Sequence, residues 1–386
     1  MKRMLIVANG LEGGGAEKVL ITLINHLDSR QYDITLYSMV ACDIHRLELM
    51  RPIHYRYFFE AVIPEDNELV RFWKKLRNKL KLLIFDFLPA RWFYFLFVTG
   101  KFDIEFAAIE GYATKVISGS GNPTSLKIAW VHIDLFNLHW TDIVFKKPDE
   151  EKKAYCRFDK IVCVSAVVKE NLDRLFEVHE KSLVLYNPVD VGDIRQKARE
   201  LVPVPRSTSK LFRMVTAGRL AEQKGFDRLL DIHRRLLADG LAHELWILGE
   251  GPQRLVLEAY IREHHLEESV CLLGFQANPY AFINQCDLFV CSSRAEGFST
   301  VATEAVILGL PVVTTDCAGM RELLLTGEDS CGLITGNDNE NLYIGLKDIL
   351  QDMTLLERLK EKARARGSAF SLEKTMNSFL GLFENQ

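Results

Sequence analysis

One stretch of sequence decides the fold: Arg294-Ala295-Glu296-Gly297-Phe298-Ser299-Thr300-Val301-Ala302-Thr303-Glu304-Ala305. The apolar run from Asp287 to Ser293 predicts a buried strand that ends just before this stretch. A helical pattern from Thr300 to Leu308 begins inside it. Glu296 is therefore expected on the loop at the carboxyl end of a strand, and Glu304 just over one turn into the next helix. Ligands of open α/β sheets bind outside these strand ends.

The same junction suits a phosphate group. The loop backbone and the first N–H groups of the helix at Thr300 and Val301 form an array of donors for an anion. A carboxylate on the loop and another on the helix would bind hydroxyl groups on either side of a diphosphate. The pattern therefore predicts a site for a nucleotide sugar.

The frame E-G-F-S-T-V-A-T-E-A, Glu296 to Ala305, continues into Gly309-Leu310-Pro311-Val312-Val313. Two glutamates separated by seven residues, with this strand after them, resemble the signature of glycosyltransferase family 4. The resemblance runs from residue 4 to about 335. It implies a retaining transferase with the α/β GT-B fold, in which two Rossmann-like domains with parallel sheets face an interdomain cleft.

Composition agrees with such a protein. A length of 386 residues suggests two domains, and a net charge of -4 argues against a nucleic-acid partner. Eight cysteines occur without a C-x-x-C pair, which favours reduced thiols in a cytoplasmic protein over disulfides or zinc. The apolar run within Met1–Gly10 is too short for a signal peptide and is interpreted as a first strand.

Alternating strand and helix patterns predict two parallel sheets. The expected strands are Met4–Ala8, Tyr32–Met39, Phe102–Ala107, Leu126–His132, Lys160–Ser165, Ser182–Tyr186, Leu211–Ala217, Glu244–Leu248, Val270–Leu273, Asp287–Cys291 and Pro311–Thr315. We assign residues 1–190 to an acceptor domain, 191–210 to a linker containing Pro203 and Pro205, and 211–367 to a nucleotide-sugar domain. The resemblance implies that a last helix, within 368–386, returns to the first domain.

Two cations follow the first strand of the second domain, in Gly218-Arg219-Leu220 and Lys224-Gly225. Arginine offers a planar fork for phosphate oxygens and lysine a point charge, although surface cations on a loop would look the same. The resemblance makes Arg219 and Lys224 phosphate ligands. It also places the turns Gly249-Glu250-Gly251-Pro252 and Gly274-Phe275 beside the nucleotide, unless Phe275 is a core residue.

The first domain contributes fewer candidates. Gly13-Gly14-Gly15 follows the first strand but lacks a complete dinucleotide or P-loop motif, so a tight turn is the alternative to an anion site. The resemblance places Gly14 and Gly15 near the donor phosphate and the acceptor. His132 ends a strand, and the resemblance places it beside the transferred sugar, where a core histidine is the alternative. Asp134 and His139 are weaker candidates.

Residues 70–98 combine basic and aromatic side chains. Apolar residues at helical spacing predict a basic amphipathic helix on a membrane surface, and the alternative is a solvated basic face. The predicted membrane or acceptor contacts are Arg71, Trp73, Lys74, Lys75, Arg77, Lys79, Lys81 and Trp92. The apolar stretch within Leu82–Val98 is interrupted by charged residues and proline, and is too short to span a bilayer comfortably.

The candidate residues fall into two sets. The catalytic set is His132, Arg219, Lys224 and Glu296. The donor-binding set is Gly14, Gly15, Gly218, Arg219, Lys224, Gly249, Gly251, Phe275, Gly297, Phe298, Ser299, Thr300, Val301 and Glu304. Glu304 would bind the ribose and Glu296 the sugar hydroxyls. No Asp-x-Asp occurs in the chain, so we expect no metal and no cofactor.

The expected function is transfer of a hexose or N-acetylhexosamine, with UDP favoured over GDP, to a lipid-linked or cell-surface glycan precursor. We expect a cytoplasmic protein held peripherally on the inner face of the cytoplasmic membrane. The alternatives are a sugar-nucleotide epimerase or hydrolase of the same fold, and a non-catalytic subunit that binds nucleotide sugar or membrane. A dehydrogenase is disfavoured because neither domain opens with a complete dinucleotide motif.

Overall fold

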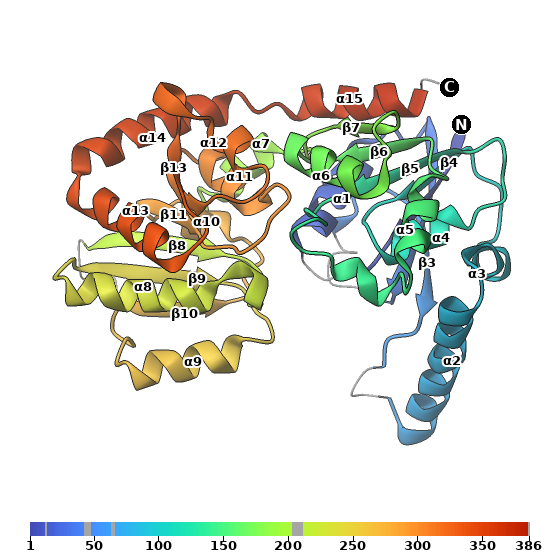
Figure 1. The fold of residues 1–386 in the computed structure, drawn as a ribbon, viewed down its shortest axis with the longest axis horizontal. Coiled ribbons are helices and arrows are strands. Elements are labelled where there is room, and N and C mark those ends of the chain that lie inside the picture. Colours follow the sequence, from blue (N-terminus) through green and yellow to red (C-terminus); the bar gives the residue numbers. More distant parts are fainter. Residues whose placement is uncertain (12–13, 42–47, 63–65, 203–210, 385–386) are drawn as a thin grey trace. The chain divides into compact units, whose positions relative to one another are not determined.

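The computed structural model describes residues 1–386 except 12–13, 42–47, 63–65, 203–210 and 385–386 (Figure 1). The chain forms two compact units. The N-terminal unit consists of Met1–Pro188 with Glu373–Gln386, and the C-terminal unit of Val189–Leu372. All seven described cysteines are free. Cys163 and Cys291 are buried, whereas Cys271, also in a strand, is only partly buried.

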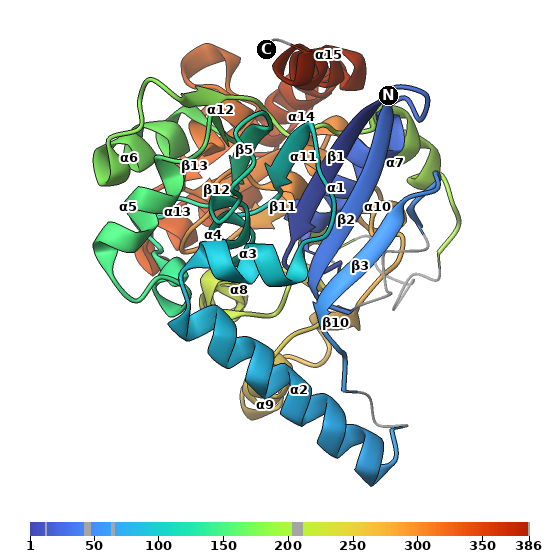
Figure 2. The same ribbon diagram turned by 90° about the vertical axis from the view of Figure 1, so that its right-hand side faces the viewer.

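The N-terminal unit is built on a seven-stranded parallel sheet of order β3-β2-β1-β4-β5-β6-β7, whose first three strands lie side by side in Figure 2. The strands are β1 Lys2–Ala8, β2 Tyr32–Val40, β3 His54–Phe59, β4 Ile104–Ala107, β5 Leu126–Val131, β6 Lys160–Cys163 and β7 Ser182–Val184. The helices are α1 Gly15–His26, α2 Glu68–Phe87, α3 Ala90–Phe97, α4 Tyr112–Ser118, η2 Trp140–Ile143, α5 Pro148–Tyr155, α6 Ala166–Phe176 and α15 Leu372–Glu384.

The central strands are continuous apolar runs because both faces of a parallel sheet are covered. Residues Met4 to Val7 of β1 are fully buried. Strand β3 was not predicted, because Phe58 is its only buried residue and an edge strand needs no apolar alternation. Nor did it predict β13 (Gly332–Thr335), which is only four residues long.

Helix α15 belongs to the N-terminal unit although it closes the chain. Its Phe379 and Phe383 are fully buried, and Phe379 packs on Trp130 of β5 with ring centroids 4.9 Å apart. Lys2 Nζ donates to the Phe383 carbonyl at 2.8 Å. These contacts explain why α15 packs on the N-terminal sheet, although all strands of that sheet precede residue 189.

The C-terminal unit has a six-stranded parallel sheet of order β10-β9-β8-β11-β12-β13. The strands before β13 are β8 Phe212–Ala217, β9 His243–Leu248, β10 Val270–Gly274, β11 Leu288–Cys291 and β12 Val312–Thr315. The helices are α7 Val191–Lys197, η3 Glu222–Lys224, α8 Phe226–Ala238, α9 Arg254–Glu263, α10 Tyr280–Ile283, α11 Thr300–Ile307, α12 Met320–Leu324, η4 Gly327–Asp329, α13 Asn339–Gln351 and α14 Met353–Ser368. Counted within the unit this is the Rossmann order 3-2-1-4-5-6, which reverses direction between β8 and β11.

The structure differs from the sequence analysis in the expected linker, 191–210. Residues Val191–Lys197 form α7, because Asp190 caps the helix through the Asp193 N–H at 2.9 Å and Ile194 is buried against Tyr280 and Ile307. The expected linker prolines, Pro203 and Pro205, lie outside the described residues.

Candidate active site

The loops that follow β8 and β11 meet at the switch point of the C-terminal sheet. Arg294 N donates to Gln223 O at 2.7 Å, and Gln223 Nε2 donates to Ala295 O at 2.8 Å. Ser292 Oγ also donates to Lys224 O at 2.9 Å. The turn that carries Lys224 and the loop that carries Glu296 are therefore one locked assembly, at the place where α/β sheets bind ligands.

Lys224 and Glu296, both expected in the site, are in direct contact. The ammonium nitrogen lies 2.7 Å from Glu296 Oε1, and Ser293 Oγ donates to the same oxygen at 2.5 Å. Burial opposes the charged form of Lys224, but the neighbouring Glu296 carboxylate outweighs it and raises the lysine pKa. The site therefore keeps a cation and a carboxylate. The pocket there is lined by Thr216, Ala217, Lys224, Phe226, Phe289, Cys291, Ser292, Ser293, Glu296 and Ser299.

Helix α11 begins at the edge of this pocket. Ser299 is its N-cap and accepts a hydrogen bond from Ala302 N at 3.4 Å, so the serine side chain has a structural partner. The N–H groups of Thr300 and Val301 belong to the first turn, where an α-helix offers no internal acceptor. These are the two N–H groups that the sequence analysis expects to bind an anion, and that role remains a prediction.

Gly319, after β12, allows the loop at Gly297 and Phe298 to pack closely. It has φ +74°, and a Cβ there would lie 2.5 Å from Gly297 O. The sequence analysis did not identify this residue, and its only signal was the Ala-Gly pair after a strand. Gly297 and Phe298 are both buried, so this loop packs closely against the segment at Gly319.

Glu304 is held apart from the Lys224 contact. It is 5% exposed, and Tyr280 Oη donates to its Oε1 at 3.0 Å. Tyr280, on α10, was not predicted, because an aromatic residue in a short apolar helix looks like core. The tyrosine fixes one carboxylate oxygen.

The predicted glycines after β8 and β9 permit two loops to touch. Gly249 has φ +136°, and a Cβ there would lie 1.9 Å from Gly218 O. A Cβ on Gly251 would lie 2.5 Å from Leu220 O, where Leu220 N also donates to Glu250 O at 2.9 Å. These glycines therefore shape the loop that presents the exposed Arg219. Phe275 is 53% exposed, so it is not the core residue considered as an alternative.

Arg228 is a buried cation that the sequence analysis missed. It is 5% exposed, and its guanidinium donates to Ser292 O at 2.7 Å and Ser293 O at 2.5 Å. It also donates to Asn337 Oδ1 at 3.1 and 3.0 Å, and Asn337 Nδ2 donates to Arg294 O at 2.9 Å. Arg228 thus anchors the loop that leads to Glu296. The available signal was a charged residue flanked by the apolar spacing of Phe226, Leu229 and Leu230.

In the N-terminal unit, Gly14 is the N-cap of α1 and Gly15 its first residue. A Cβ on Gly14 would lie 2.1 Å from Glu17 Oε2, the end of a flexible side chain that would have to move aside. Gly13, the first glycine of the predicted motif, lies outside the described residues.

His132 is partly buried at the end of β5. Its Nε2 lies 3.1 Å from Ala108 O, and because a carbonyl only accepts, Nε2 carries the hydrogen and Nδ1 the lone pair. Burial lowers the pKa of His132 to about 3, against the opposing effect of this bond, so the ring is neutral at physiological pH. It can therefore accept a hydrogen bond from a hydroxyl through Nδ1.

The two weaker candidates already have partners within the unit. Asp134 is 2% exposed and accepts from the Phe136 main chain, Asn137 and Asn171. His139 Nε2 lies 2.8 Å from Glu151 Oε2. Both residues order the segment after β5.

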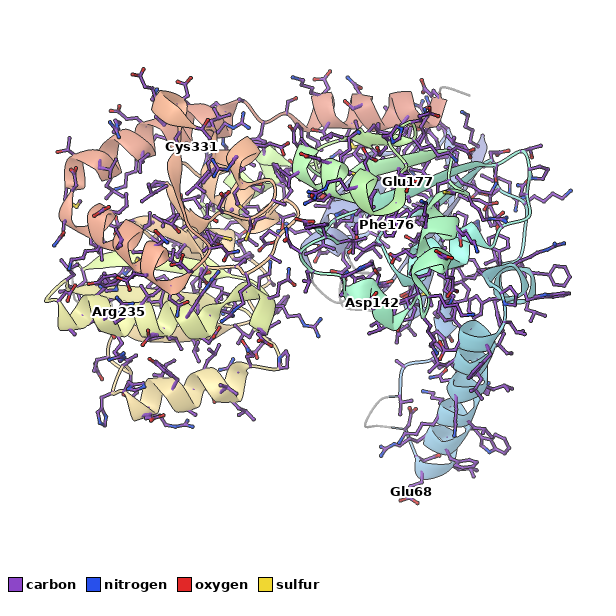
Figure 3. All side chains as sticks on the ribbon, viewed as in Figure 1. Glu68, Asp142, Phe176, Glu177, Arg235 and Cys331 are labelled. Carbon is purple, nitrogen blue, oxygen red and sulfur yellow. The ribbon has the colours of Figure 1, made fainter. Side chains whose placement is uncertain are left out.

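Helix α2 extends away from the sheet of its unit, and Glu68 marks its free end (Figures 2 and 3). Three of the predicted cations bind groups that precede α2 in the same unit. Lys74 lies 2.8 Å from Asp66, Arg77 lies 2.9 Å from Glu60, and Lys81 donates to Phe58 O at 2.7 Å.

The outward surface of α2 and α3 is mainly apolar. Trp73 and Trp92 are each 53% exposed, and Phe85 is the only buried residue of α2. Two further predicted cations, Lys75 and Lys79, are also exposed there. Among the described residues, no helix has the length and apolarity to cross a bilayer.

Comparison with known proteins identifies the family. The model of glycosyl transferases group 1 matches residues 199–366. N-acetylgalactosamine-N,N'-diacetylbacillosaminyl-diphospho-undecaprenol 4-alpha-N-acetylgalactosaminyltransferase of Campylobacter jejuni is 31% identical over 97% of both chains. The amylovoran biosynthesis glycosyltransferase AmsD of Erwinia amylovora is 24% identical over 94% of both.

The chain belongs to the group 1 glycosyltransferases, and the family predicted from Glu296 to Val313 is confirmed. Among solved structures, Anabaena HepE in complex with UDP and glucose superposes over the full length of both chains, with a TM-score of 0.76 and 18% identity. The predicted fold, two Rossmann-like domains with parallel sheets, is confirmed.

Proposed function

We propose that this protein is a retaining, metal-independent transferase. It moves a hexose or N-acetylhexosamine from a UDP-sugar to a hydroxyl of a glycan carried on a lipid diphosphate. The observation that carries the proposal is the locked assembly of Lys224, Glu296 and the start of α11 at a Rossmann switch point. The relative from Campylobacter, whose name specifies a diphospho-undecaprenol acceptor, supports the acceptor class. The UDP bound to HepE supports the donor base.

In this proposal the donor diphosphate lies against the first turn of α11. Arg219 and Lys224 neutralise the charge that grows on the diphosphate as the glycosidic bond breaks, which is where fixed electrostatics act most strongly. Glu296 accepts from hydroxyls of the sugar, and Glu304 from those of the ribose. The Tyr280 hydroxyl donates to Glu304 Oε1 at 3.0 Å and so holds the orientation of that carboxylate.

The acceptor hydroxyl attacks from the face that the phosphate leaves, so the anomeric configuration is retained. The departing phosphate takes the proton, and no protein base is required. His132 accepts a hydrogen bond from a sugar hydroxyl at Nδ1 and cannot donate through that atom. Because His132 Nδ1 only accepts, we expect slower transfer from a sugar donor that lacks the contacted hydroxyl. A phosphate group in place of that hydroxyl would offer oxygen acceptors to an acceptor and should not bind.

A lipid-linked acceptor requires access to a membrane. The exposed aromatic and aliphatic side chains of α2 and α3, with Lys75 and Lys79, fit a helix that lies in the headgroup region. We place the protein peripherally on the inner face of the cytoplasmic membrane.

The test is transfer of labelled sugar from UDP-, GDP- and ADP-sugars into lipid-linked glycan, with chelator present. The wild type is compared with Lys224→Ala and Glu296→Gln, and with Glu361→Gln, an exposed carboxylate on α14, as control. Label from one donor in the lipid fraction, lost in the first two variants only, supports the proposal.

Other outcomes favour the alternatives. Free sugar or nucleotide without a labelled acceptor indicates an epimerase or hydrolase. Binding without turnover of any donor indicates a non-catalytic subunit. Loss of transfer with chelator contradicts metal independence.

A further inference from the structure

A second buried carboxylate lies at the switch point of the N-terminal sheet, between β1 and β4. Glu110 follows β4 and is 3% exposed. Its Oε2 accepts from His132 N at 2.8 Å, and its Oε1 accepts from Trp140 Nε1 at 3.2 Å. One side chain therefore holds the end of β5 and the start of η2.

The indole of Trp140 fits against Gly111. This glycine has φ +81°, and a Cβ there would lie 2.6 Å from Trp140 Cη2. The next bond in the chain of contacts joins His139 to Glu151 on α5 at 2.8 Å. The segment from residue 132 to 143, marked by Asp142 in Figure 3 and called here the His132 segment, is thus held by Glu110 and Glu151, and also by the bond from Asn171 to Asp134.

We propose that Glu110 is a positioning residue whose ionised carboxylate holds the His132 segment in place, and that protonation of Glu110 loosens it. An ionised carboxylate accepts at both oxygens, which matches the two N–H donors. A protonated carboxyl carries an O–H on one oxygen and brings that hydrogen against an N–H group. One of the two bonds is then lost.

The surroundings place this change near neutral pH. Burial raises the pKa of Glu110 to about 7, against the lowering effect of the bonds from His132 and Trp140. The ionisable groups around it provide no cation: Glu151 and Tyr155, on α5, also have pKa values raised by burial, and His132 is neutral. Within the described part of the chain, the groups that donate to the Glu110 carboxylate are neutral N–H groups.

The first test follows tryptophan fluorescence from pH 5.5 to 8.5 and needs no substrate. The chain has five tryptophans, so the wild type is compared with Trp140→Phe, which keeps a ring on Gly111. We expect a wild-type transition with a midpoint near pH 7, absent from Trp140→Phe and from Glu110→Gln and kept in Glu180→Gln, an exposed control. The proposal is overturned if the wild type shows no fluorescence transition, or if the transition persists in Trp140→Phe. Both outcomes can be observed even if Glu110→Gln does not fold.

The second test rests on the proposed function. Wild-type kcat/KM for sugar transfer should fall about tenfold per pH unit below the Glu110 pKa. Glu110→Gln should have a lower kcat, an unchanged donor KM and no such acid limb. An acid limb kept in Glu110→Gln overturns the link between the segment and turnover. If no donor is turned over but the fluorescence transition behaves as expected, the proposed function fails and the role of Glu110 stands.

Discussion

Both units place a nearly buried carboxylate beside their switch point, but they stabilise it differently. Glu296 lies 2.7 Å from the Lys224 ammonium group. Glu110 accepts from the neutral N–H groups of His132 and Trp140, and forms no ion pair among the residues that the structure describes. A charge paired with a charge stays ionised over a wide pH range, whereas a charge held by neutral dipoles in a buried site has a pKa close to neutrality. The Lys224 ammonium group therefore keeps its charge, whereas the Glu110 carboxyl changes its charge near neutral pH.

The largest expected effect comes from breaking the charge pair. Lys224→Ala should lower kcat by about 10²–10³-fold, the usual loss for one donor to developing charge. It should also destabilise the C-terminal unit, because Glu296 is left buried without its cation. Adding Glu296→Gln should restore stability and leave transfer defective, measured by denaturant unfolding and by kcat. If the double variant regains transfer, the only role of Lys224 is to neutralise the charge of Glu296, and it does not act on the donor.

The next effect tests whether the Glu296 loop depends on its buried anchor. Arg228→Met removes the bonds to Ser292 O, Ser293 O and Asn337, and should destabilise the unit by about 3 kcal/mol, since bonds from charged groups are among the stronger ones. Arg228→Lys should retain part of the stability and of kcat. The matched control is Arg262→Met, on the exposed part of α9. Equal unfolding free energies for Arg228→Met and this control would exclude an anchoring role.

A smaller effect concerns two buried groups, His233 in the C-terminal unit and Glu110 in the N-terminal unit, whose contributions to stability change with pH in opposite directions. His233 is fully buried, with Nδ1 2.8 Å from His243 Nε2 and Nε2 2.9 Å from Ser269 Oγ. Burial lowers the pKa of His233 to about 3, so its contribution to stability is present above the unfolded pKa and falls as the pH drops below about 6.5. The loss is about 1.4 kcal/mol by pH 5.5 for one such group.

Glu110 has the opposite sign. Its pKa is raised to about 7 because the desolvation of the buried charge outweighs the bonds from His132 and Trp140. Its contribution to the free energy of unfolding is therefore present at low pH and is lost as the pH rises through that value, even though protonation removes one bond to the His132 segment. Denaturant unfolding at pH 5.5 and 7.5 should show a smaller pH dependence in His233→Gln than in the wild type. Glu110→Gln should show a larger pH dependence of the unfolding free energy than the wild type. Changes of the same sign and size in both variants would contradict the opposite roles of His233 and Glu110.

The residues that sequence could reveal are those whose type and spacing match the chemistry. Lys224 and Glu296 are such residues: the strand and helix patterns placed each of them just after a strand, and the resemblance assigned both to the donor site. Arg228 and Glu110 act through bonds to main-chain atoms of segments distant in the chain, 64 residues for Arg228 and Ser292 and 22 for Glu110 and His132. No local pattern specifies such partners, so only the fold reveals them.

The same limit applies at the surface. The basic residues of α2 predicted one charged face, but the acids that pair with Lys74 and Arg77 come from neighbouring segments. Strand β3 was missed because only Phe58 of its side chains is buried. Pattern reasoning succeeds where burial repeats with a regular period, and fails where a single tertiary contact determines the outcome.

The smallest expected effect concerns the exposed apolar surface of α2 and α3. Helix α8 of the C-terminal unit has no such surface, because its apolar side is buried. Because Lys74, Arg77 and Lys81 have partners in their own unit, Lys75→Gln with Lys79→Gln should account for most of the attraction to anionic vesicles, about 1 kcal/mol per lysine. Trp73→Ser with Trp92→Ser should weaken binding to neutral and anionic vesicles alike, since aromatic burial does not depend on lipid charge. Cosedimentation with both vesicle types separates the two effects. If the tryptophan pair changes neither, the aromatic surface of α2 and α3 does not contact lipid, and the N-terminal unit must receive its acceptor by another surface.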